Sequence, residues 1–243
     1  MSEFNNQNVY ESMNDGNSLK AYMTKVFTNM GIGVGITALV AYLCYRSIFS
    51  YGIIAQIFFL GSSAMIAQLL LFVAQIGLVI WLNRAINSLS PVACRAVFFV
   101  YAALTGVTFG VIPVAYNIGV VFQAFAFAAV LFISCAIIGR VTNVDLSKYQ
   151  GILFGALISL VVVTVVSIFV PALRSNLLIG YIGLFIFMAY TAFDVQRISH
   201  FYYMANDGDA LHENLAIYGS LQLYLDFVNM FLYLLRILGR RRN

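Results

Sequence analysis

The stretch LAIYGSLQLYLDFVNMFLYLLRIL, residues 215–238, decides the fold class of this chain. Asp226 and Arg236 are its only charged residues. A helix needs about 20 mostly apolar residues to cross a bilayer, so the stretch is long enough to span one. Its polar residues are spaced 4, 3, 4 and 3 apart and share one helical face: Gln222, Asp226, Asn229, Tyr233 and Arg236. Such a stripe must avoid lipid, so we expect the other helices to surround this helix or to line a cavity with it.

Six further apolar stretches precede it, at residues 26–45, 53–82, 92–116, 118–138, 151–170 and 177–198. Together the stretches predict an all-α membrane bundle of seven spans. The composition agrees, because 62% of the 243 residues are hydrophobic, 9% are charged and the mean hydropathy is +0.92. So few charges cannot cover a water-soluble surface, which excludes a soluble enzyme, a coiled coil and a disordered regulator.

Three regions are expected along the chain. Residues 1–25 are rich in polar side chains and are predicted to be a disordered segment without the features of a signal peptide. Residues 26–239 form the transmembrane domain, and residues 240–243 form a basic tail. The cysteines Cys44, Cys94 and Cys135 lie far apart in apolar runs, so neither disulfides nor a zinc site are expected. We expect no cofactor and no nucleic-acid partner.

The orientation follows from the basic residues near the ends of the spans. Two of them, Arg46 and Arg174, lie on the side opposite the N-terminus. The N-terminal side has seven: Lys20, Lys25, Arg84, Arg95, Arg140, Lys148 and Arg197. The N-terminus is therefore predicted to lie inside. Seven full spans would then place the basic tail outside, so either the last stretch is re-entrant or the early helices dominate the orientation.

Prolines and glycines predict helix ends and helix contacts. Ser90 is expected to cap a helix that begins at Pro91, and Pro113 is expected to kink the third span. Glycines four residues apart allow helices to approach closely in lipid. Three such pairs are predicted contact sites: Gly31 with Gly35, Gly106 with Gly110, and Gly151 with Gly155.

Two carboxylates, Asp194 and Asp226, fall well inside predicted spans, where an ionised group costs a few kcal/mol or more. The other acids lie in the tail or the loops and are expected to be solvated. The two aspartates reach the same depth only if the sixth span continues beyond Ile198, through the aromatic residues to Met204. We predict this extension, with the chain reversing at residues 205–214.

Two carboxyls in contact cannot both ionise cheaply, so the pair is expected to share one proton and to act as a pH sensor. Arg197, one turn from Asp194, and Arg84 are the candidates to hold the deprotonated pair. The bare pair would also attract a cation. Calcium takes six to eight oxygen ligands, so the two aspartates with Asn229, backbone carbonyls and waters predict a weak, transient site. An alternative is that these groups only hold the helices together.

Several segments together resemble the Bax inhibitor-1 family. AYTAFDVQRI at residues 189–198 is similar to that family's signature in the sixth helix, and LYLDFVN at residues 223–229 to its second aspartate motif. LLRILG at residues 234–239 is similar to its C-terminal end, most of all in the bacterial branch. YAALTG at residues 101–106 and DLS at residues 145–147 extend the resemblance across most of the apolar part of the chain.

The resemblance implies a bundle with the last helix central, wrapped by the other six. It implies a calcium leak channel of the bacterial inner membrane, gated by a proton shared between Asp194 and Asp226 and latched by an arginine, for which Arg84 is the best match by position. Gln222, Asn229 and Tyr233 would then line the pore, and calcium and protons would be the ligands. The chain departs from the family's pattern at Asn143-Val144, where a basic pair is usual, and in a longer stretch between the aspartates.

Two other classes of function compete with a leak channel. The first is a regulatory membrane protein without transport, which modulates a membrane protease or a stress or cell-death response through a protein partner. The second is an intramembrane aspartyl protease. Such proteases have a Gly-x-Gly-Asp segment, which this chain lacks, so the protein is not expected to be an enzyme. His200 and His212 are expected to be polar surface residues near the last reversal of the chain.

Overall fold

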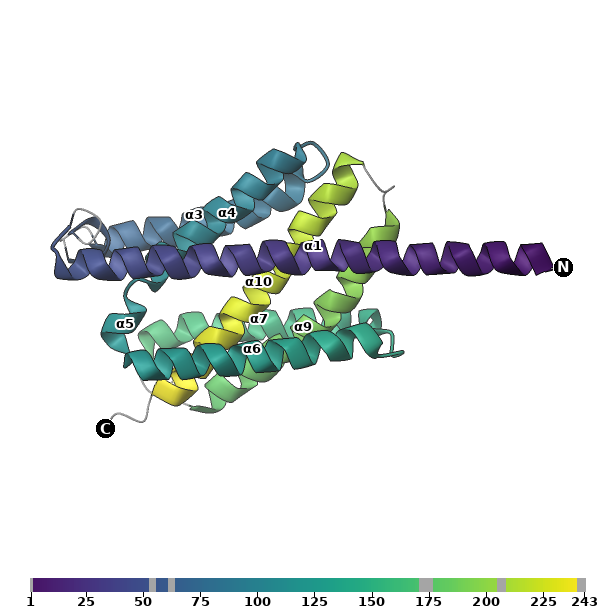
Figure 1. Ribbon diagram of the computed structural model, residues 1–243. Coiled ribbons are helices and arrows are strands. Elements are labelled where there is room, and N and C mark those ends of the chain that lie inside the picture. The colour runs from purple at the N-terminus through teal and green to yellow at the C-terminus, as the bar shows by residue number, and fades with distance from the viewer. Residues whose placement is uncertain (1, 53–55, 61–63, 171–176, 205–208, 240–243) are drawn as a thin grey trace.

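The computed structural model describes residues 2–52, 56–60, 64–170, 177–204 and 209–239, and these are helical almost throughout, with no strand among them (Figure 1). The long helices are α1 (Ser2–Phe49), α3 (Ala64–Ala85), α4 (Pro91–Phe109), α6 (Ile118–Val141), α7 (Gln150–Phe169), α9 (Leu177–Phe201) and α10 (Ala210–Leu238). Short elements connect them: η1 (Gln56–Leu60), α5 (Ile112–Ala115), η2 (Leu146–Tyr149) and η3 (Tyr202–Met204).

The predicted bundle of seven spans is confirmed. Among the described residues, seven helices are long and apolar enough to cross a membrane, and they match the seven stretches expected from the sequence. The second expected stretch, residues 53–82, is not one helix, because the π-helix η1 and the helix α3 share it. The last stretch is one unbroken helix of 29 residues, about 43 Å long at 1.5 Å per residue. A helix of this length without a break can cross the membrane completely, which favours a full seventh span over a re-entrant stretch.

The last helix is central, as expected. Figure 1 shows α10 crossing diagonally between α3 and α4 on one side and α6, α7 and α9 on the other. Its main contacts are with α9, α6, α1 and α4, and the α9–α10 interface is the most extensive in the bundle. The expectation that all six other helices wrap it is wrong in one respect, because α3 packs chiefly on α4 and α7 chiefly on α9. These two helices form the outer layer.

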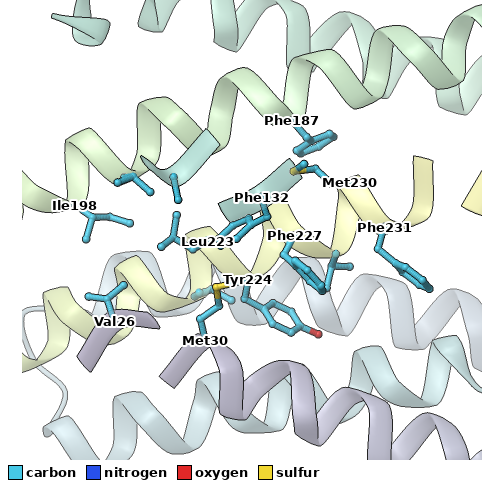
Figure 2. Close-up of a cluster of buried hydrophobic side chains, with 14 of the residues drawn as sticks. Val26, Met30, Phe132, Phe187, Ile198, Leu223, Tyr224, Phe227, Met230 and Phe231 are labelled. Atoms are coloured by element: carbon cyan, nitrogen blue, oxygen red, sulfur yellow. The ribbon is translucent and has the colours of Figure 1, made fainter. Parts of the chain in front are cut away.

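Aromatic and aliphatic side chains of α10 fill the core. Figure 2 shows Leu223, Tyr224, Phe227, Met230 and Phe231 of this helix meeting side chains from three other helices. The neighbours that Figure 2 labels are Val26 and Met30 of α1, Phe132 of α6, and Phe187 and Ile198 of α9. Most of these residues expose less than a tenth of their surface, so α10 is held by protein on every turn of its middle section.

Both predicted helix signals at proline are present. The Ser90 side chain accepts a hydrogen bond of 3.3 Å from the Ala93 amide, and Pro91 is the first residue of α4. The third span breaks ahead of Pro113, because α4 ends at Phe109 and the short helix α5 begins at Ile112. The missing amide of proline explains the break.

Only one of the three predicted glycine pairs makes helix contacts. A methyl group on Gly106 would meet Val40 and Thr37 of α1, and one on Gly110 would meet Cys44. The expectation for the other two pairs is wrong, since nothing lies within 4 Å of a Cβ at Gly31, Gly35, Gly151 or Gly155. In α1 it is instead the intervening Gly33 that packs, against Phe98 of α4. Gly33 is two residues from Gly31 and from Gly35, so it points about 160° away from either of them and meets a different side of the bundle.

The expected boundary at residue 25 is too late. The helix α1 begins at Ser2, so residues 2–25 are helical where a disordered segment was expected. Leu19, Tyr22 and Met23 are buried against the bundle, so the transmembrane domain includes these residues. Leu19, Tyr22, Met23 and Val26 recur at helical spacing, a signal that the polar composition of the segment obscured. The basic tail at residues 240–243 lies outside the described residues.

Candidate functional site

Asp194 and Asp226 are buried carboxyls on neighbouring helices. Asp194 lies on α9 and exposes 6% of its surface, and Asp226 lies on α10 and exposes 4%. Both belong to membrane-spanning helices. Groups of this kind are costly to bury in lipid, so their presence at the most extensive helix interface of the bundle marks a candidate site.

The extension predicted for the sixth span is present and aligns the two helices. α9 continues through Phe201, and η3 carries the helical path to Met204. The two helices lie close along their length because glycines meet side chains: Gly219 of α10 packs on Ile198, and Gly183 of α9 packs on the Tyr233 ring. The result is an antiparallel pair in which both aspartates lie within the bundle.

The two carboxyls interact with each other electrostatically. In the described part of the chain, one oxygen of Asp226, Oδ2, is buried without a hydrogen-bond partner. Cys135 of α6 feels the charge of Asp226, and Tyr190 of α9 feels the charges of both aspartates. Two like charges repel strongly in such surroundings, because both carboxyls are buried where the effective dielectric constant is low. The arrangement suits a group that holds a proton or meets a cation.

The two candidate arginines differ in position. Arg197 is partly buried, interacts electrostatically with Asp194, and places its guanidinium 5.5 Å from the centre of the Phe201 ring. Arg84 is exposed at the last turn of α3, and no ion pair joins it to an acid within the described ranges. The structure therefore places Arg197 near Asp194, whereas Arg84 has no acidic partner among the described residues.

The polar stripe of α10 faces protein, as the sequence predicts. Gln222, Asn229, Tyr233 and Arg236 are all partly buried. The Asn229 amide donates a 2.8 Å hydrogen bond to the Leu225 carbonyl of its own helix, and the Tyr233 ring stacks on Phe187 of α9. Tyr233 therefore contributes to the contact between α9 and α10, whereas the Asn229 amide is satisfied within its own helix.

Several polar contacts that hold α10 were not expected from the sequence. Glu213 forms ion pairs with Lys25 of α1 and, at 3.7 Å, with Arg95 of α4, so it is not the solvated loop acid that was expected. Asn214 is buried, and its amide donates 2.8 Å hydrogen bonds to the Ile86 and Leu89 carbonyls. These residues bind the start of α10 to α1, to α4 and to the loop after α3.

The two histidines also differ from expectation. His212 is buried beside the rings of Tyr22, 4.8 Å away between centres, and Tyr202, 5.5 Å away. The expectation of a surface residue is wrong for His212 and right for His200, which is exposed. The apolar residues around His212 come from α1 and η3, and no local sequence pattern brings them together.

A polar cavity of about 660 Å³ lies between the loop after α6 and the end of α9. Its lining includes Asp145, Gln196, Arg197 and His200. Gln196 ties the loop to α9, because it accepts a 2.7 Å hydrogen bond from the Leu146 amide and donates one of 2.9 Å to the Val144 carbonyl. Asp145 accepts hydrogen bonds from the Ser147 amide and hydroxyl, which lower the pKa of its carboxyl. Arg197 thus lines this cavity and also interacts electrostatically with Asp194.

The residues present do not form a strong metal site. No group of three or more His, Cys, Asp or Glu side chains with the arrangement of metal ligands occurs in the described ranges. Two carboxyls supply too few oxygens for a cation that takes six to eight.

Comparison with known proteins agrees with the resemblance seen in the sequence. A family model described as "Inhibitor of apoptosis-promoting Bax1" matches residues 19–243. The chain is 37% identical over 222 residues to an uncharacterized protein of Borreliella burgdorferi, covering 91% of this chain and 93% of that one. It is 33% identical over 225 residues to the inner membrane protein YbhL of Escherichia coli (strain K12), covering 92% of this chain and 93% of YbhL.

A third relative, an uncharacterized protein of Deinococcus radiodurans, is 35% identical over 225 residues, covering 93% of this chain and 92% of its own. Seven apolar helices and an inner-membrane relative agree with the expected location of a multi-pass inner-membrane protein in contact with the lipid bilayer. The match of the family model covers nearly the whole chain, including both aspartate motifs. This protein therefore belongs to the Bax inhibitor-1 family of membrane proteins.

Proposed function

We propose that this protein is a pH-sensitive calcium leak channel, gated by a proton shared between Asp194 and Asp226. One observation carries the proposal: two buried carboxyls on adjoining central helices interact electrostatically, and one oxygen of Asp226 has no hydrogen-bond partner in the described structure. A structural hydrogen-bond pair would satisfy its oxygens, because an unpaired buried acceptor costs about 1–3 kcal/mol. In a site that exchanges protons or cations, an oxygen without a hydrogen-bond partner can accept the proton or the cation.

The shared proton gives the pair two charge states. With the proton the pair carries a single negative charge, and without it the pair carries two. The bare pair attracts a divalent cation and the Arg197 side chain, which interacts with Asp194. Competition between the arginine and calcium for the same carboxyls is a physical basis for a gate. In this scheme Arg197 takes the latch role, and Gln222, Asn229 and Tyr233 line the adjoining helix face.

The test is calcium flux into proteoliposomes that contain the purified protein, measured across about pH 5 to 8. We expect a flux that varies with pH in the wild-type protein and that loses this variation in Asp194→Asn and Asp226→Asn. Asp209→Asn is the matched control, since Asp209 is exposed at the start of α10 and its side chain makes no capping hydrogen bond. An unchanged pH dependence in both aspartate variants would contradict the mechanism.

The same experiment separates the channel from a regulatory protein without transport. If the wild-type protein passes no calcium at any pH, and crosslinking in membranes captures a stoichiometric protein partner, the regulatory function is the better description. In that case Asp194→Asn and Asp226→Asn would change only the stability of the bundle. If the wild-type protein passes calcium at some pH and either substitution abolishes that flux, the regulatory function without transport is excluded.

A further inference from the structure

An apolar groove opens on the lipid-facing surface of the bundle between α1 and α6. Its volume is about 400 Å³. Exposed residues form its rim, with Tyr42 of α1 exposing 55% of its surface and Phe122 of α6 exposing 69%. Phe227 and Phe231 of α10 form its floor and are 6% and 7% exposed. The groove is thus a gap between α1 and α6 through which the central helix α10 faces the bilayer.

The groove has the length and position of a single leaflet. Along α1 its lining runs from Val34 to Tyr45, about 16 Å at 1.5 Å per residue. The hydrocarbon core of a bilayer is about 30 Å thick, so one leaflet spans about 15 Å. The membrane-spanning part of α1, Ser18–Phe49, has its midpoint near Val34. The groove therefore begins at the bilayer centre and ends at the interface on the side away from the N-terminus.

Neither water nor empty space suits this groove. Water molecules in a cavity need two to four polar partners. Of the polar side chains in the lining, Thr37 already hydrogen-bonds internally, to the Ala102 carbonyl at 2.9 Å and to the Tyr224 hydroxyl at 2.6 Å. An empty groove of this size would deprive its walls of dispersion contacts. A hydrocarbon chain in the groove restores those dispersion contacts, and it needs no hydrogen-bond partners.

The shape and charge of the site favour a phospholipid chain over a protein helix. A helix with its side chains is about 10–12 Å wide. The groove between α1 and α6 has a volume of about 400 Å³, which is too small to hold such a helix. Arg46 directly follows Tyr45 at the interfacial end of the groove, is exposed, and forms no ion pair in the described part of the chain. A guanidinium at that depth suits the phosphate of a lipid whose acyl chain enters the groove.

We infer that one acyl chain of a phospholipid, from the leaflet opposite the N-terminus, binds in the groove between α1 and α6 and packs directly on α10. This site differs from the aspartate site in its ligand and in its residues. Because its floor is part of the central helix, the bound chain acts as a structural ligand of the bundle and not merely as a neighbour of its surface.

The test uses a phosphatidylglycerol probe with a photoreactive diazirine at mid-chain, in nanodiscs that contain the full-length protein. After illumination, adducts are located by mass spectrometry. We expect labelling at Phe122 and Tyr42 to exceed that at Ile152, an exposed residue of α7 outside the groove, by about tenfold, which corresponds to about 1.4 kcal/mol of preference.

Filling the groove supplies the matched control. Ala38→Phe and Ala41→Phe place rings in the lining and should remove the excess labelling of the groove. Leu39→Phe, on the neighbouring lipid-facing side of the same helix, should leave it unchanged, because Leu39 does not line the groove. Equal labelling of Phe122 and Ile152 in the wild-type protein overturns the inference, as does labelling that survives both alanine substitutions.

A second measurement does not depend on how the variants fold. Native mass spectrometry of the wild-type protein, released from detergent, should show one retained phospholipid per chain. If mild delipidation removes all lipid and labelling in nanodiscs is uniform, the inference is overturned. The groove then makes only the contacts that any lipid-facing surface makes with the bilayer.

Discussion

The Tyr224 hydroxyl lies 2.6 Å from the Thr37 hydroxyl, which joins the central helix α10 to α1 inside the bundle. Thr37 donates in turn to a backbone carbonyl, 2.9 Å to Ala102 of α4 or 3.1 Å to Gly33 of its own helix. Tyr224 is fully buried, and its ring packs against Phe98 and Tyr101 at 5.6 and 6.0 Å between ring centres. This polar contact therefore joins three helices inside the bundle.

Tyr224→Phe keeps the ring and removes the hydroxyl. We expect a loss of about 1 kcal/mol in the free energy of unfolding, because the hydrogen bond to Thr37 disappears while Thr37 retains its carbonyl acceptors. Unfolding in mixed detergent micelles measures the change. Tyr181→Phe is the control, since Tyr181 is exposed on α9 and its hydroxyl makes no hydrogen bond within the described residues. If the two substitutions change the free energy of unfolding equally, the hydrogen bond to Thr37 does not stabilise the bundle.

Asn214→Ala should cost more. The Asn214 amide satisfies the Ile86 and Leu89 carbonyls at 2.8 Å each, near the end of α3, and the substitution leaves them without this donor. We expect a loss of about 2–3 kcal/mol, since buried carbonyls without donors carry the full cost of leaving water. Asn83→Ala, at an exposed position of α3, should be nearly neutral in the same unfolding measurement. A small effect of Asn214→Ala would mean that water replaces the lost donor.

Gly139→Ala should disturb the interface of α6 and α9. A methyl group at Gly139 would collide with the backbone of Ala192, which is two residues before Asp194, so one helix must shift. We expect a loss of about 1–3 kcal/mol from overpacking. Gly151→Ala is the opposite case: its methyl group meets nothing within 4 Å, and alanine is the better helix former, so the bundle should gain slightly in stability. Similar melting temperatures for the two variants would refute the close approach.

The loop after α6 should respond to acid through Asp145. Hydrogen bonds from Ser147 lower the pKa of the Asp145 carboxyl, so the contact stabilises the loop above the ordinary aspartate pKa. The stabilisation should disappear as the pH falls through the lowered pKa. Hydrogen exchange at the Ser147 amide, compared between wild type and Asp145→Asn, measures this. Protection that depends on pH to the same extent in both proteins would contradict the assignment.

Much of the fold could be predicted from hydropathy. Seven spans, the Ser90 cap, the break at Pro113 and the continuation of α9 toward Met204 follow from composition and local signals, because each depends on residues close in the chain. The central position of α10 also followed, since a polar stripe at helical spacing cannot face lipid. The two aspartates stood out for the same energetic reason.

Other features depend on contacts that a local pattern does not contain. Gly33 and not Gly31 or Gly35 meets a neighbour, and His212 is buried while His200 is exposed. The segment before residue 25 looks polar on average, yet Leu19 and Tyr22 pack on the bundle. In each case the rotation of a helix about its axis decides the environment, and that rotation is set by the helices around it.

By itself, the amino-acid sequence determined that this chain spans a membrane seven times around its last helix, because a bilayer admits few other forms for such a composition. The tertiary structure decided which arginine lies beside Asp194, which acid pairs with Lys25, and where α1 and α6 part to expose α10 to lipid. These are distances between segments far apart in the chain. They arise from the summed fit of many apolar side chains, and no single motif encodes that fit.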